Sequence, residues 1–144
     1  MRGRIVSLAM SRHKGTKKDP VEEVCVRQDH GVEGDAHAGP WHRQVSLLAS
    51  ESIQRAKEMG LEASFGDFGE NIATLGIDWT RVPLGSRIRI GEVELELTQI
   101  GKECHRKCAI YYMAGDCIMP REGVFARVIK GGTLRVGDSI EVQM

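Results

Sequence analysis

The segment Arg87–Thr98 alternates apolar and charged residues on both sides of a short turn at Gly91-Glu92. Because successive side chains of a strand point to opposite faces, each arm would carry one apolar and one charged face. Two such arms around a short glycine-containing turn are typical of an antiparallel β-hairpin with one face in the core. This part of the chain is therefore predicted to form a sheet that is covered on one side.

Short strand-forming segments with glycine or proline turns between them recur along the 144 residues. Strands are predicted at Arg4–Met10, Val21–Arg27, a short segment from Ile72 and Ser139–Val142, while Arg43–Leu48 fits a strand or an apolar turn and Val124–Ile129 a strand or a helical turn. One helix is predicted, capped by Ser50 and ended near Met59 by Gly60. The pattern predicts a mainly β, single-domain protein over residues 1–144, folded as a closed or nearly closed β-barrel with a few helices.

The charge and apolar content exclude several classes of function. The formal net charge is zero, which argues against sequence-independent nucleic-acid binding. No apolar run approaches the roughly 18 residues of a membrane span, and the N-terminus lacks the apolar core of a signal peptide. We therefore expect a cytoplasmic protein with no membrane partner, in which the four cysteines are thiols or ligands rather than disulfides. Cys25, between Val24 and Val26, is expected to be a small buried residue.

Two of the cysteines, Cys104 and Cys108, lie in the strongly basic stretch Gly101–Tyr112. Lys102, Arg106 and Lys107 surround them, and cationic neighbours favour the thiolate form of a cysteine. The thiolate is the form that attacks, carries sulfur or ligates a metal. This stretch is therefore predicted to be a reactive thiol site.

Three other interpretations of the same stretch stay open. A structural zinc site would use four ligands, Cys104, His105, Cys108 and Cys117, but the spacing gives one tight pair and a stray residue rather than two pairs. A Cys–His acyl-transfer enzyme would need His37 or His42 as its base, without any local signature for either. Two inert buried cysteines would rarely be accompanied by so many cations.

The order of motifs along the chain resembles the MOSC domain, which is named after the C-terminal part of molybdenum-cofactor sulfurases. The residues that carry the resemblance are Gly34–Gly39, Arg43–Leu48 with Glu51-Ser52, Gly69–Ile72, the Leu84–Thr98 hairpin, the cysteine stretch, Gly123–Val128 and Gly137-Asp138. The match runs from about Ile5 to Val142 and is similar to the short, stand-alone bacterial type. It implies a barrel of mixed strands.

The resemblance implies a protein that binds the molybdenum cofactor, carries sulfur as a cysteine persulfide for metal–sulfur centres, or does both. Cys108 is the better match to the family's cysteine, as sulfur carrier or molybdenum ligand, although Lys107 stands where relatives often have proline. Cys104 remains a second catalytic candidate. The implied partners are a cysteine desulfurase, which would supply pyridoxal phosphate, and a molybdoenzyme. The alternatives are a small molybdenum-dependent oxidoreductase that reduces N-hydroxylated compounds, and a non-catalytic, zinc-stabilised binding module.

Molybdopterin ends in a phosphate and can hold an anionic metal centre, so its pocket requires cations and N–H donors. The residues expected to bind it are Lys14, Lys17, Lys18, His37, Arg43, Asn71, Lys102 and Arg106. Lys14–Lys18 forms a short basic loop suited to phosphate. Arg43 offers a planar fork for oxyanions.

Overall fold

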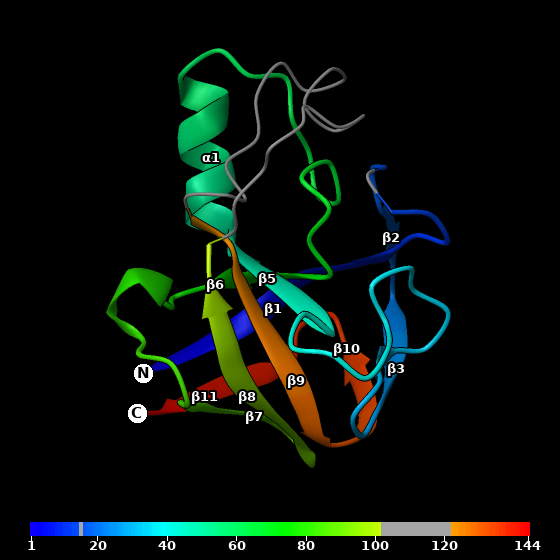
Figure 1. Ribbon diagram of the computed structural model, residues 1–144. Helices are drawn as coiled ribbons and strands as arrows, with labels where there is room; N and C mark the ends of the chain where they lie inside the picture. Colours follow the sequence, from blue (N-terminus) through cyan, green and yellow to red (C-terminus); the bar gives the residue numbers. More distant parts are fainter. Residues whose placement is uncertain (15, 102–121) are drawn as a thin grey trace.

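Seven strands close into a barrel in the computed structural model, which describes residues 1–14, 16–101 and 122–144 (Figure 1). In spatial order these strands are β11 (Ser139–Gln143), β7 (Arg87–Ile90), β8 (Val93–Ile100), β9 (Val124–Lys130), β5 (Val45–Ala49), β6 (Ile72–Leu75) and β1 (Arg2–Met10). Pairing of β11 with the start of β1 closes the ring, and β2 (Asp19–Val21) pairs with the end of β1. β5 and β6 are parallel whereas the other neighbours are antiparallel, so the predicted barrel of mixed strands is confirmed.

The predicted hairpin is the β7–β8 pair. Ile90 faces Val93 across the turn, and Gly91 adopts a φ of 61°, which favours glycine. The apolar residues from Ile88 to Leu97 are buried in the barrel, and charged residues alternate with them. The outcome follows from the period-2 pattern, because only one register places all the apolar side chains on the core face.

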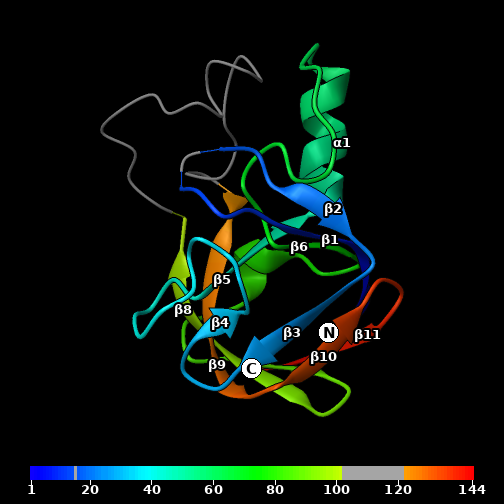
Figure 2. The ribbon, with the colours of Figure 1, turned by 90° about the vertical axis from the view of Figure 1, so that its right-hand side faces the viewer.

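A second, three-stranded sheet lies against the barrel and consists of β10 (Gly132–Arg135), β3 (Glu23–Arg27) and β4 (Gly31–Val32) (Figure 2). Val24 and Val26 of β3 point inward and join the barrel core. The expectation that Cys25 is buried was wrong. It is exposed, with its Sγ 3.9 Å from Oγ1 of Thr133. A residue between two inward-facing valines must face outward.

The helix α1 (Ser50–Glu58) covers one end of the barrel (Figure 1). Its buried residues Ile53 and Ala56 pack in a second apolar cluster with Leu48 and Phe125. The predicted cap at Ser50 was wrong, because the N-cap residue is Ala49, without a side-chain hydrogen bond.

Gly60 ends α1 as predicted: it adopts a φ of 99°, and its N–H donates to the Lys57 carbonyl at 3.0 Å. A 3₁₀ turn, η1 (Trp79–Arg81), lies between β6 and β7. Among the described residues, neither helix has the length and apolarity that a membrane span requires.

Candidate functional site

A buried ion pair lies beyond the end of β1. The Lys18 ammonium donates to Asp35 Oδ1 at 2.8 Å and to Ser11 Oγ at 3.2 Å, and its Nζ is 3.0 Å from His37 Nδ1. The side chains of Lys18 and Asp35 are both 0% exposed, whereas that of His37 is 21% exposed. His37 is therefore the member of this cluster that reaches solvent.

Asp35 fastens the loop after β1 to the glycine-rich loop after β4. Its Oδ1 accepts from the Ser11 N–H and its Oδ2 from the His37 N–H, both at 3.0 Å, and the Ala36 N–H donates to the Ser11 carbonyl at 2.7 Å. Burial of the carboxyl opposes its ionisation, but the nearby ring of His37, the hydrogen bond from Lys18 and the charge of Lys18 prevail. They hold the pKa of Asp35 well below its usual range. The carboxylate is therefore charged, and Lys18 balances it.

Lys18 is positioned from the other side by the loop before β6. The Lys18 N–H donates to the Gly66 carbonyl at 2.9 Å, and a Cβ on Gly66 would lie 2.0 Å from the Lys18 carbonyl oxygen. Gly66 also adopts a φ of 88°, which favours glycine. Both the close contact with Lys18 and the backbone conformation therefore exclude a larger residue. The buried Glu70 carboxyl shapes this loop, because it accepts from the N–H groups of Gly66 at 2.7 Å and Phe68 at 3.2 Å.

Glu70 is expected to make stability depend on pH. Burial raises its pKa to about 7 from 4.5, although its hydrogen bonds with backbone N–H groups act in the opposite direction. The folded carboxyl keeps its proton at a pH where the unfolded one loses it, so this stabilisation is complete below pH 4.5 and is lost as the pH rises through about 7.

The shift corresponds to about 3 kcal/mol between pH 4.5 and about pH 8. We expect urea unfolding to show the wild type losing this much relative to Glu70→Gln, which does not titrate, over that range. A stability difference that stays constant with pH would contradict the assignment.

Two cations gather around the half-buried Trp41. Lys14 Nζ lies 5.0 Å from the centroid of the Trp41 ring, and Arg43 Cζ lies 5.6 Å from it and 5.7 Å from the centroid of Phe125. The indole N–H donates to the His37 carbonyl at 2.7 Å, which joins this group to the buried cluster. Neither cation has a carboxylate partner among the described residues. Both are therefore available to pair with a bound anion.

Gln99 near the end of β8 connects Arg43 to the segment that holds the cysteines. Its Oε1 accepts from Arg43 Nε at 3.1 Å, and its Nε2 donates to the Gly101 carbonyl at 2.7 Å. The Gly101 N–H donates to the Gly123 carbonyl at 2.7 Å, so the residues on either side of 102–121 are held together next to Arg43.

Four of the predicted site residues, Lys102, Cys104, Arg106 and Cys108, lie outside the described residues, as does Cys117. Their predicted roles stay predictions. Within the ranges 1–14, 16–101 and 122–144, no group of three His, Cys, Asp or Glu side chains is arranged to hold a metal. The zinc interpretation depends on cysteines outside those ranges and is therefore untested.

Two other predicted residues have internal partners. Asn71 is buried, accepts from the N–H and hydroxyl of Ser46 at 3.0 and 3.1 Å, and donates to the Ala9 carbonyl at 3.1 Å. Lys17 lies 3.6 Å from Asp67. Asn71 therefore supports the barrel wall, and of the predicted cations in the described residues, Lys14 and Arg43 are the two that have no acidic partner.

The prediction from sequence missed Ser11, Asp35, Trp41 and Gln99 as site residues. Asp35 and His37 stand two positions apart between glycines, a spacing that signals a shared role, whereas nothing local marks Ser11 or Gln99.

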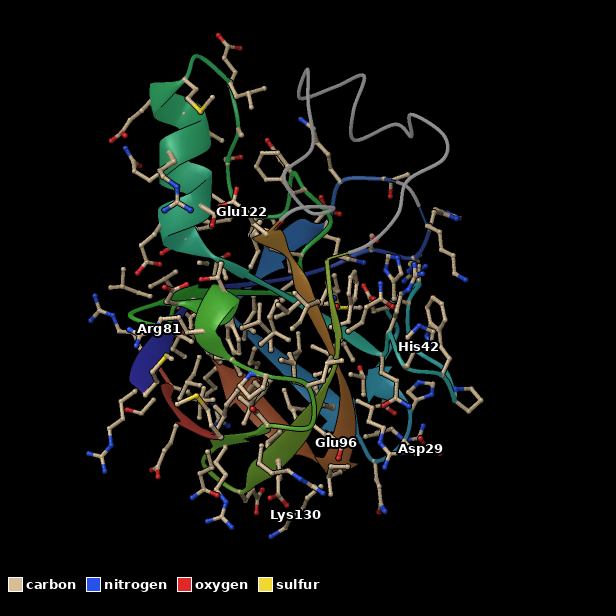
Figure 3. All side chains as sticks on the ribbon, turned by 60° about the vertical axis from the view of Figure 1, so that its left-hand side comes forward. Asp29, His42, Arg81, Glu96, Glu122 and Lys130 are labelled. Atoms are coloured by element: carbon tan, nitrogen blue, oxygen red, sulfur yellow. The ribbon has the colours of Figure 1, made fainter. Side chains whose placement is uncertain are left out.

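His42, the other histidine considered as a catalytic base, is exposed, and its ring packs edge-on against Trp41 with ring centroids 5.8 Å apart. Figure 3 shows His42 far from Arg81 and from Glu122, which lies near the base of α1.

Comparison with solved structures supports the fold. The YuaD protein from Bacillus subtilis has a TM-score of 0.81 at 20% identity, covering 99% of this chain and 96% of its own. YiiM from Geobacillus stearothermophilus has a TM-score of 0.74 at 22% identity, over 99% and 75% of the two chains. YiiM from Escherichia coli has a TM-score of 0.70 at 22% identity, over 100% and 70%. A search of curated proteins found no match.

The family comparison covers the glycine-rich loop after β4, the barrel strands from β5 onward and, of the second sheet, the strand β10. The family described as MOSC domain, which is associated with binding of the molybdenum cofactor, has a model that matches residues 33–141. This range includes Asp35, His37, Trp41, Arg43 and Gln99. The chain therefore belongs to the MOSC domain family.

Proposed function

We propose that this protein binds the molybdenum cofactor beside Trp41 and carries sulfur as a persulfide on Cys108 for the assembly of metal–sulfur centres. The observation that supports it is the pair of cations, Lys14 and Arg43, which share one aromatic ring without an acidic partner among the described residues. Two cations that lie near the same ring repel each other, and a bound anion would reduce this repulsion.

The residues around Trp41 suit an anionic cofactor. When bound, the molybdenum cofactor supplies a terminal phosphate and an anionic metal centre. Arg43 would bind its oxyanions with the guanidinium nitrogens that Gln99 does not use, and Lys14 would add a flexible point charge. His37 would donate a hydrogen bond from its partly exposed ring.

The sulfur step needs no external oxidant. The Cys108 thiolate would attack the terminal sulfur of a persulfide on a partner cysteine desulfurase. One S–S bond forms on Cys108, the partner's S–S bond breaks, and the partner's cysteine leaves as a thiolate. Lys102 and Arg106, which are close to Cys108 in the sequence, would favour the attacking thiolate. Pyridoxal phosphate would belong to the partner, and a molybdoenzyme would receive the sulfur.

Intact-mass measurement after incubation with a cysteine desulfurase and free cysteine tests this step. We expect the wild type and Cys104→Ser to gain the mass of one sulfur atom, reversible by a thiol reductant, and Cys108→Ser to gain none. Cys25→Ser serves as the control, since Cys25 is exposed on β3 in the second sheet. A gain of sulfur by Cys108→Ser that is equal to that of the wild type would contradict the role of Cys108.

The same experiment separates the alternatives. An oxidoreductase for N-hydroxylated compounds would hold molybdenum through Cys108 and turn over with a partner reductase, without an added sulfur atom. A zinc-stabilised module would instead keep tightly bound zinc in its native mass spectrum.

A further inference from the structure

The position of the ring proton of His37 is determined by two neighbours. Nδ1 lies 3.0 Å from Lys18 Nζ and 3.7 Å from Asp35 Oδ2. The first distance is that of a hydrogen bond and the second is too long for one. The partner of Nδ1 is therefore the ammonium rather than the carboxylate.

The surrounding hydrogen bonds leave one choice of donor. A lysine ammonium has donors and no acceptor, so His37 Nδ1 must accept from it. Ser11 shows the same direction of donation, because its hydroxyl donates to the His13 carbonyl at 3.1 Å and its oxygen is thereby available to accept from Lys18. The Asp35 carboxylate lies 2.8 Å from Nζ and forms an ion pair with the ammonium.

The ring itself is held in place from its backbone. The His37 N–H donates to Asp35 Oδ2 at 3.0 Å, and the His37 carbonyl accepts from the Trp41 indole at 2.7 Å. No partner of Nε2 is found in the part of the chain that the structure describes, and the side chain is 21% exposed. A neutral imidazole that accepts at Nδ1 carries its proton at Nε2.

We propose that Lys18 is a positioning residue that fixes His37 as the Nε2–H tautomer, so that His37 presents a hydrogen-bond donor to an oxygen or sulfur acceptor of an anionic ligand. Lys18 thus acts through His37, from a position in which its own side chain is 0% exposed. The identity of the ligand rests on the proposed function, whereas the tautomer does not.

The tautomer also decides what His37 does not do. With its proton at Nε2 and Lys18 at Nδ1, the ring has no lone pair directed at a ligand. It therefore selects ligands that present an acceptor, such as an oxyanion or a sulfido group, and does not act as the base of a Cys–His acyl-transfer site.

Long-range ¹H–¹⁵N spectra of the full chain, labelled at histidine nitrogens, test the assignment, with His37→Gln identifying the signals of His37. We expect the free wild-type protein to show His37 only as the Nε2–H tautomer, while the exposed His42 shows an ordinary mixture. In Lys18→Met, His37 is expected to become a mixture as well. An Nδ1–H form in the wild type would overturn the proposal, and this spectrum suffices if Lys18→Met does not fold.

Sodium molybdate is then added as an oxyanion probe. We expect the Nε2–H signal of His37 to shift with saturation. An unchanged His37 signal would overturn its role as the donor. Because the tautomer is determined without cofactor, its failure is distinguishable from a failure of cofactor loading.

Discussion

Lys18→Met is expected to lower the free energy of unfolding by about 3–5 kcal/mol, the typical cost of breaking a buried ion pair. The substitution keeps the apolar stem but leaves the Asp35 carboxylate charged and without its cation in a fully buried position. Urea unfolding at neutral pH measures the loss. Near-ultraviolet circular dichroism shows whether the variant keeps its packing.

A double substitution separates the ion pair from simple loss of packing. Lys18→Met combined with Asp35→Asn removes both charges and retains an amide oxygen for one of the two N–H groups, those of Ser11 and His37, which donate to different oxygens of the carboxylate. We expect it to be less destabilised than the sum of the two single variants. The matched control is the exposed pair of Arg27 and Glu33, 3.3 Å apart, where Arg27→Met should cost less than about 1 kcal/mol. Additive effects at Lys18 and Asp35 would contradict the account.

Arg43→Ala is expected to weaken binding of the molybdenum cofactor by about 10- to 150-fold. This range corresponds to the 1.5–3 kcal/mol that a hydrogen bond to a charged group contributes. Arg43→Lys should recover only part of the affinity, because an ammonium does not reproduce the planar fork that Gln99 and the two aromatic rings orient. Anaerobic titration of the cofactor-free protein with the isolated cofactor measures the dissociation constants.

The control for this variant is Arg81→Ala. Arg81 is exposed on η1, far from the loop that carries His42 (Figure 3). Its removal changes the net charge by the same amount as that of Arg43, so it tests for a general effect of charge. Equal losses of affinity in the two variants would show that the cofactor does not bind at Arg43.

Local periodicity was enough to predict most of the barrel. The β7–β8 hairpin follows from strict alternation, and Gly60 ends α1 because a φ of 99° favours glycine. The segment Val124–Ile129 fitted a strand or a helical turn, and pairing with both β5 and β8 makes it a strand. That choice was settled by neighbours distant in the sequence, which a short window of residues does not contain.

The site was harder to predict, because its geometry depends on contacts between loops. Lys18 looked like one more cation of a phosphate loop, and only its approach to Asp35, 17 residues later, makes it an interior residue. The close contact of Gly66 with the Lys18 backbone, which brings that about, has no signature in the sequence. By contrast, the exposure of Cys25 was predictable, because in a strand the side chains of the valines on either side of it face the core and its own side chain then faces outward.

The most direct test of cofactor binding is to purify the protein anaerobically from a host that makes the molybdenum cofactor and to measure its molybdenum and pterin content. We predict close to one molybdenum and one pterin per chain in the wild type and in Arg81→Ala, and a large loss of both in Arg43→Ala. A wild-type protein that contains neither molybdenum nor pterin under these conditions would contradict the central claim.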